Sequence, residues 1–211
     1  MCIRDRGNVT ASIMVNMGAY AAITATTGLA GAAAVELQQG WGRQIGITPF
    51  PSAGFIASKV VVALAYSVLA VGAVYVAGLF VGTRMDAWVW LATFGLLIVG
   101  AVTFALYGLA FGLLFRSEAA VSAASGLVVV MMFLGNGFMP LSGILLKLSV
   151  FVPVWGITRL AAYPLAQGEG FDGETGVVQY ELWQILLNVV AWSIVFAVLC
   201  VLGARRGTGR K

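Results

Sequence analysis

Histidine is absent from this sequence of 211 residues, and charged residues make up only 9% of it. The absence of histidine excludes Ser-His and Cys-His nucleophile pairs, histidine-ligated zinc and histidine-ligated haem. Cysteine is also scarce, since Cys2 and Cys200 are too few for a disulfide framework or a metal cluster. No G-x-x-x-x-G-K-[ST] motif is present, so these residues do not hydrolyse nucleotide through a P-loop. We therefore expect a chain that is not an enzyme and holds no cofactor of its own.

Apolar residues dominate instead: they form 61% of the sequence, and the mean hydropathy is +0.98. A soluble domain carries about 25% charged residues, so there is too little charge here to cover a water-exposed surface. A helix needs about 20 mostly apolar residues to cross a bilayer. Because the apolar runs are continuous rather than alternating, they predict helices and not barrel strands. We expect an all-α integral membrane protein with five transmembrane helices, at residues 14–35, 60–81, 88–115, 119–139 and 182–202.

Lys and Arg are concentrated on one side of the predicted spans, which indicates their orientation. The connection between the first two spans, the turn at Arg116 and the C-terminal tail together hold seven basic and two acidic residues. The opposite side holds five basic and six acidic residues. We expect the positive side to be cytoplasmic, with the tail at 207–211 inside the cell and the N-terminus outside. The basic residues are scattered along the chain, so we expect a lipid bilayer as a partner and no nucleic acid.

The segment at residues 140–165 is apolar but is not expected to be one span. It contains Lys147 and Arg159, and three prolines interrupt it: Pro140, Pro153 and Pro164. Proline interrupts helices, and the stretches between these prolines are too short to cross a bilayer. We predict one or two short helices that dip into the outer leaflet or lie on it.

Residues 168–176, GEGFDGETG, follow this segment and contain a formal G-x-G-x-x-G pattern. A dinucleotide fingerprint requires a preceding strand and a following helix whose N-terminus meets the phosphates. The glycines here alternate with Glu169 and Asp172, whose charges would repel phosphate. We therefore interpret the stretch as an exposed, flexible acidic loop.

Within the five predicted spans, no Asp, Glu, Lys or Arg lies clear of the ends. Proton-coupled carriers usually place acidic residues there, so a transporter of this composition would need an external ATPase as its energy source. Gly108 and Gly112 are spaced so that they could seat a neighbouring helix. Four polar residues are candidates either for hydrogen bonds between helices or for contacts with a substrate: Thr24, Thr27, Asn136 and Asn188.

The connection at residues 36–49 is longer than a bare link between helices requires. It combines charged residues with Trp41 and apolar residues, and it ends at Thr48 and Pro49. Such a stretch can form a short amphipathic helix that is presented to another protein. Alternatively, it can lie on lipid headgroups and be anchored by Trp41.

These features together resemble the type-2 permease subunits of ABC exporters, particularly the bacterial drug and antibiotic efflux branch. The connection is similar to the family's cytoplasmic E-x-x-x-G-x-x-x-x-L-x-x-T-P element. The order of spans and the stretch at 138–142, FMPLS, before a proline-broken outer segment also match. The likeness covers about residues 14–206, the expected transmembrane domain. The residues that carry the cytoplasmic element are Glu36, Gly40, Trp41, Arg43, Thr48 and Pro49.

The resemblance implies a half-transporter in a bacterial inner membrane that pairs with a second permease half, as a homodimer or a heterodimer. Each half would engage an ABC ATP-binding subunit, a separate chain that holds ATP and Mg. Residues 36–49 would form the segment that couples the permease to the ATPase. Residues 140–165, with Pro140, Pro153, Arg159 and Pro164, would form outer re-entrant helices that close the exit. The exported molecule would be drug-, antibiotic- or lipid-like.

The family pattern has six spans, and this sequence contains five, without the first span and the amphipathic helix before it. Met1–Arg6 resembles no part of the family, and we interpret residues 1–13 as containing a foreign start to a truncated reading frame. Two other classes remain open. One is a non-transporting polytopic membrane protein, such as an assembly or immunity factor. The other is an intramembrane enzyme, for which Lys147 is the candidate lysine of a Ser-Lys dyad on the outer side.

Overall fold

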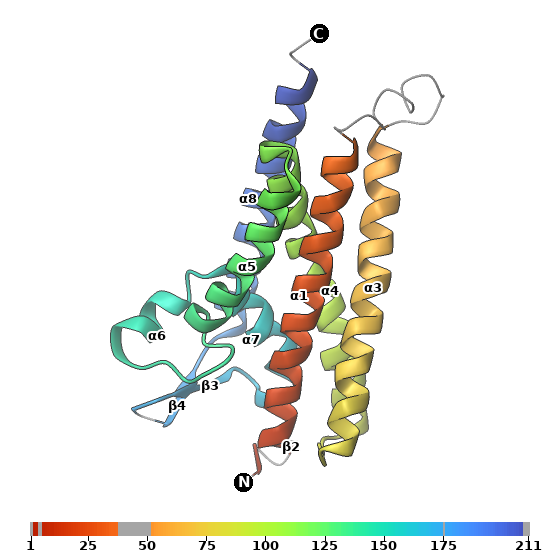
Figure 1. Cartoon of the computed structure of the whole chain (residues 1–211). Coiled ribbons are helices and arrows are strands. Elements are labelled where there is room, and N and C mark those ends of the chain that lie inside the picture. The colour runs from red at the N-terminus through yellow and green to blue at the C-terminus, as the bar shows by residue number, and fades with distance from the viewer. Residues whose placement is uncertain (1, 4–5, 38–51, 175, 209–211) are drawn as a thin grey trace.

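The structure is a computed structural model that describes residues 2–3, 6–37, 52–174 and 176–208. This part of the chain forms a bundle of long helices with two small antiparallel sheets (Figure 1). The helices are α1 (Val9–Glu36), α3 (Ser52–Phe80), α4 (Ala87–Phe115), α5 (Glu118–Leu134), α6 (Gly143–Ser149), α7 (Pro153–Ala166) and α8 (Leu182–Thr208). The strands are β1 (Cys2–Ile3), β2 (Gly7–Asn8), β3 (Glu169–Asp172) and β4 (Gly176–Gln179).

Four of these helices, α1, α3, α4 and α8, are long and apolar enough to cross a membrane. The count becomes five if α6 and α7, which meet at an angle of 83°, are taken together as one broken span. The chain is therefore a helical, multi-pass membrane protein, as its composition predicts.

The predicted span at 119–139 differs from the helix found there. α5 has 17 residues, which at 1.5 Å per residue is about 25 Å, short of a hydrocarbon core of about 30 Å. The helix ends at Leu134 because Gly135 and the left-handed backbone of Asn136, with φ of +56°, turn the chain away. Hydropathy does not register such a turn, so the apolar run continues past the end of the helix.

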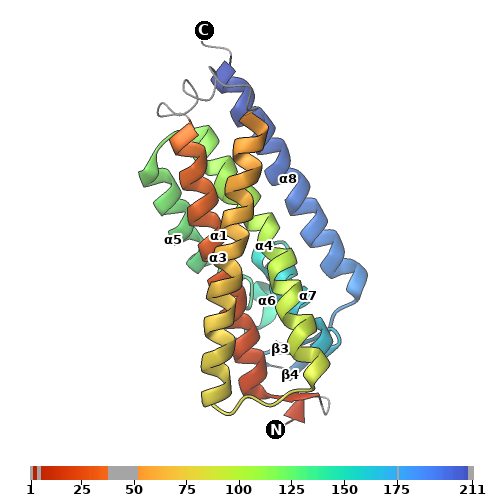
Figure 2. The same ribbon diagram turned by 90° about the vertical axis from the view of Figure 1, so that its right-hand side faces the viewer.

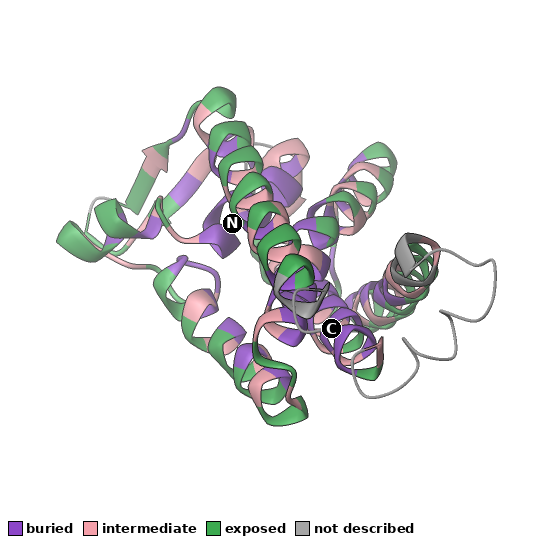
Figure 3. Cartoon of the chain, turned by 90° about the horizontal axis from the view of Figure 1, so that it is seen from above, coloured by how far each residue is buried: buried purple, intermediate pink, exposed green. Residues whose placement is uncertain are grey.

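α1 and α4 form the centre of the bundle, whereas α3 and α8 lie at its edges (Figures 1 and 2). In the most apolar stretch of each helix, 61% of residues are buried in α1 and 44% in α4, against 22% in α3 and 17% in α8. Seen along the bundle, the buried residues lie on the inner faces of the helices (Figure 3). Exposed apolar side chains on α3 and α8 are what a bilayer-facing surface requires.

Glycines bring α1 and α4 into close contact. A Cβ at Gly108 would collide with the backbone of Thr27, and a Cβ at Gly112 would collide with the carbonyl of Gly31. Small residues of this kind let two helix backbones approach closely in a membrane. The expectation that Gly108 and Gly112 seat a neighbouring helix is therefore confirmed, and the neighbour is α1.

α1 begins at Val9, earlier than the predicted residue 14, because Asn8 caps it. The Asn8 Oδ1 accepts hydrogen bonds from the backbone N–H of Ala11 at 3.1 Å and of Arg84 at 3.2 Å. The Asn8 Nδ2 donates to the carbonyl of Gly82 at 3.0 Å. A cap satisfies otherwise unpaired N–H groups at a helix start, and here it also ties α1 to the turn between α3 and α4.

The proline-broken segment folds into α6 and α7, and two expectations about this region need correction. α7 starts at Pro153, as expected, because a proline at the first helical position loses no bond. The predicted break at Pro164 is wrong: α7 continues through it to Ala166 and forgoes the one N–H bond that a proline lacks. The loop predicted at 168–176 is in part a strand, because residues 169–172 form β3 and pair with β4 at 176–179, while residues 171, 173 and 174 are exposed as predicted.

Candidate functional site

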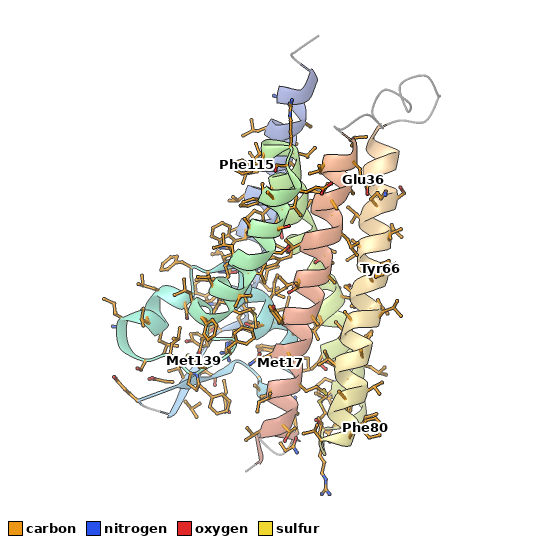
Figure 4. The ribbon with its side chains drawn as sticks, in the orientation of Figure 1. Met17, Glu36, Tyr66, Phe80, Phe115 and Met139 are labelled. Atoms are coloured by element: carbon orange, nitrogen blue, oxygen red, sulfur yellow. The ribbon has the colours of Figure 1, made fainter. Side chains whose placement is uncertain are left out.

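The two ends of the bundle present different groups. The α1 N-terminus, the α3–α4 turn, α6, α7 and the β3–β4 hairpin gather at one end, which we call the hairpin end (Figure 1). Glu36 lies at the other end, which we call the Glu36 end, near the described end of α8 (Figure 4). The residues predicted to matter for function are divided between these two ends.

At the Glu36 end, an ion pair joins α1 to α3. The Lys59 Nζ lies 2.7 Å from the Glu36 Oε2, and the two side chains are 37% and 47% exposed. The pair therefore holds Glu36, the last residue of α1 and the first of the predicted coupling segment, beside the first turns of α3. The other predicted residues of that segment lie outside the described residues: Gly40, Trp41, Arg43, Thr48 and Pro49.

At the hairpin end, Asn136 joins the connection after α5 to β3. Its Nδ2 donates to the carbonyl of Phe171 at 2.9 Å, and its Oδ1 accepts from the N–H of Leu141 at 3.0 Å. Asn136 is 4% exposed. Asparagine is one of the few residues that tolerates a left-handed backbone, so the same side chain suits both the turn and the bonds. Pro140 lies in this connection, before α6.

Arg159 of α7 lies behind Asn136. Its Nη2 donates to the Asn136 carbonyl at 3.1 Å, and its Nε is buried without a partner in the described part of the chain. A Cβ at Gly170 would lie 2.7 Å from the Tyr180 ring and 3.4 Å from the Arg159 Nη1, so the backbone of β3 covers both side chains. Burial raises the pKa of Tyr180, and the charge of Arg159 opposes this rise.

A cavity of about 310 Å³ opens beside Arg159. It lies between the first turns of α1, the α5–α6 connection, α7 and β3, and Figure 4 labels Met139, one of its lining residues. Apolar side chains make up most of the lining. The polar and charged residues in the lining are Ser12, Asn16, Asn136, Arg159 and Glu169.

Asn188 fixes the corner between α6 and α7 against α8. Its Nδ2 donates to the carbonyls of Val150 at 2.7 Å and Val152 at 3.2 Å. The indole N–H of Trp192 donates to the Phe151 carbonyl at 2.9 Å, one turn further along α8. The carbonyls of this corner therefore find donors on α8 in place of a continuous helix.

The other two predicted polar residues lie on α1. The Thr24 hydroxyl donates to the Tyr20 carbonyl of its own helix at 2.7 Å. Thr27 is buried where α1 meets Gly108, and its hydroxyl has no partner among the described residues. Of the four candidates, the structure thus brings Asn136 to the cavity and places Thr24 and Thr27 along α1, with Asn188 at the α8 corner.

Sequence reasoning missed Ser12, Asn16 and Glu169 as lining residues. Ser12 and Asn16 are four residues apart and so share one face of α1, a signal that was available within the sequence. Glu169 was assigned to a solvated loop, and only the pairing of β3 with β4 brings it to the cavity.

The described residues contain no group of three His, Cys, Asp or Glu side chains placed to hold a metal ion. The arrangement defines a class, a multi-pass helical membrane protein with a polar cluster at one end of its bundle. Comparison with protein-family models, with curated proteins and with solved structures finds no match to this chain.

Proposed function

We propose that this chain is the permease subunit of an ATP-driven exporter of the ABC type-2 kind, with ATP and Mg held by a separate ATPase chain. The observation that carries the proposal is the ion pair, 2.7 Å long, between Glu36 at the end of α1 and Lys59 in the second turn of α3, the two helices that the connection joins. This connection is the one whose sequence resembles the family's cytoplasmic element. Because the ion pair ties together the two helices that flank this connection, a displacement imposed on the connection by a partner protein would be transmitted to both helices.

The packing of α1 supports such a transmission. α1 contacts both α3 and α4 over much of its length, and its close approach to α4 rests on glycines. Closely packed helices transmit displacement because protein interiors have low compressibility. A displacement applied at Glu36 would therefore move α1 as a body and reach the cavity at the hairpin end, where α1 begins.

In this proposal the Glu36 end and the C-terminus face the cytoplasm of a bacterial cell, and the hairpin end faces outward. The excess of basic residues on the Glu36 side supports that orientation. α6 and α7 would close the exit as re-entrant helices, and the exposed apolar faces of α3 and α8 would contact lipid or a second permease half. The exported molecule would be drug-, antibiotic- or lipid-like.

The test is export by proteoliposomes that contain the chain together with an ABC ATPase that co-purifies with it. We expect ATP-dependent movement of a hydrophobic drug probe. Glu36→Gln and Arg43→Gln are expected to keep ATP hydrolysis and membrane insertion while export falls toward the level without ATP. Glu174→Gln, which neutralises an exposed acidic residue of the hairpin end, is the matched control and should export normally.

Export at the wild-type rate by both coupling variants would refute the role of this segment. If no ATPase co-purifies with the chain and no export is seen, the non-transporting class, an assembly or immunity factor, takes the place of the exporter.

A further inference from the structure

Arg159, beside the cavity at the hairpin end, is a buried cation with few hydrogen-bond acceptors around it in the described part of the bundle. Arginine has five N–H donors, and within the described residues Arg159 donates one hydrogen bond, to a neutral backbone carbonyl. Its Nε is buried and unpaired there. A buried charge is costly unless an opposite charge or several acceptors compensate it. An acceptor oxygen supplied from the cavity would meet this need.

The Asn136 side chain already has structural work at both ends of its amide, since it holds the Phe171 carbonyl and the Leu141 N–H. Ser12 and Asn16 of α1 are different. Both line the cavity, and the structure gives neither side chain a hydrogen-bond partner within the described chain. They stand one helical turn apart, so a hydroxyl and an amide from α1 face the cavity that Arg159 lines from α7.

The remaining wall is apolar and continues to the protein surface. Among the lining residues, Ile13 is 54% exposed, Met139 is 52% exposed and Phe171 is 40% exposed. The cavity therefore combines a polar part with an apolar rim that leads to the membrane-facing surface. Its volume of about 310 Å³ is at the lower limit of small-molecule pockets, which begin at about 300 Å³. That volume accommodates the headgroup of an amphiphile and the first carbons of its alkyl tail.

We propose that this cavity binds one amphiphile with a singly charged anionic headgroup, a carboxylate or a phosphodiester, on an alkyl tail. The headgroup oxygens accept from Arg159 and from Asn16, and the tail runs over Ile13 and Met139. Arg159 is the one cationic side chain among the described lining residues, so the lining matches a single negative charge. The proposal goes beyond export, because binding at this end requires neither an ATPase nor transport.

Native mass spectrometry of the full chain in neutral detergent tests the proposal. The probes are dodecanoate with dodecanol as its neutral match, and phosphatidylglycerol with diacylglycerol as its neutral match. We expect one bound anionic probe per chain, and binding at least about tenfold tighter than the neutral match, the effect of a charge-assisted hydrogen bond. Binding of dodecanoate alone indicates a ligand delivered from water, and binding of phosphatidylglycerol alone indicates a bilayer lipid; either supports the proposal.

Arg159→Gln should weaken binding of the anionic probe about tenfold or more. Lys147→Gln is the matched control, because Lys147 is an exposed cation of α6 at the same end and does not belong to the cavity lining. If Arg159→Gln does not fold, Ser12→Phe fills the cavity, leaves Arg159 in place and should abolish binding. Equal binding of neutral and anionic probes overturns the proposal. So does an equal loss in Lys147→Gln, or unchanged binding in Ser12→Phe.

Discussion

The polar contacts within the two ends of the bundle are of different kinds. At the hairpin end, Asn136, Arg159 and Asn188 donate to backbone carbonyls of other elements from buried or partly buried positions. At the Glu36 end, the described polar contact between α1 and α3 is an ion pair whose two side chains are more than a third exposed, and it lies beside the apolar packing of Val60 against α1. Buried side-chain hydrogen bonds hold these elements in one geometry, whereas exposed ion pairs contribute little to stability. The polar contacts of the hairpin end therefore fix its geometry, whereas the ion pair of the Glu36 end is easily exchanged.

The largest effect is expected from a change in the middle of the bundle, which supports both ends. Gly108→Val would push α1 away from α4, because any Cβ at Gly108 collides with the Thr27 backbone. We expect a loss of more than about 3 kcal/mol in the free energy of unfolding, as for severe overpacking of a core. Thermal unfolding in detergent measures it.

Gly126→Val is the matched control for this change, because a Cβ at Gly126 meets nothing within 4 Å. A stable Gly108→Val protein with the same unfolding temperature as Gly126→Val would show that α1 and α4 do not pack through these glycines.

The next largest effect is expected at the hairpin end. Asn136→Ala removes two hydrogen bonds and places alanine at a φ of +56°. About 1 kcal/mol for each bond and about 1 kcal/mol more for the left-handed backbone, which alanine tolerates less well than asparagine, give a loss of about 3 kcal/mol. Hydrogen exchange should show faster opening of β3 and of the connection before α6, while exchange in α3 stays unchanged.

Thr24→Ala provides the comparison for Asn136→Ala, because the Thr24 hydroxyl bonds only within its own helix in the described structure. If the two variants show equal hydrogen-exchange rates in the β3–β4 hairpin, the Asn136 hydrogen bonds do not stabilise the hairpin end.

The smallest effect on stability is expected at the Glu36 end. Lys59→Met breaks the pair with Glu36, and an exposed ion pair contributes less than about 1 kcal/mol. We expect the unfolding temperature to change little, and the small effect to shrink further as salt is added because exposed charges are screened. A loss in the free energy of unfolding as large as that of Asn136→Ala, and independent of salt, would show that the polar contacts at both ends contribute equally to stability.

Helix positions could be predicted well where a local property decides them. α3, α4 and α8 begin or end close to the predicted spans, since a long apolar run is sufficient to indicate a helix in a membrane. The predictions failed where a single backbone feature decides the boundary. Gly135 and Asn136 end α5 early, and Asn8 starts α1 early through a cap. The hairpin was missed because its pairing extends to Gln179, beyond the glycine-rich stretch that suggested a loop.

The candidate site could be predicted only as a set of unusual residues. Arg159, Asn136 and Asn188 stand out in the sequence because polar residues are rare in apolar segments. Their roles depend on partners that lie 23 positions away for Arg159, 35 for Asn136 and 38 for Asn188. No spacing rule links these positions, because the turns that bring them together depend on tertiary contacts.

The sequence by itself determined the class of this protein and the existence of its long helices. The reason is that the free energies of transferring apolar residues into a bilayer add up along the chain and do not depend on tertiary contacts. Only the tertiary structure decided that Arg159 is enclosed beside a cavity and that Ser12 and Asn16 face the same space. The exposure of a polar group depends on which backbone covers it, and here β3 packs closely over Tyr180 and beside Arg159 because Gly170 has no side chain to collide with the Tyr180 ring.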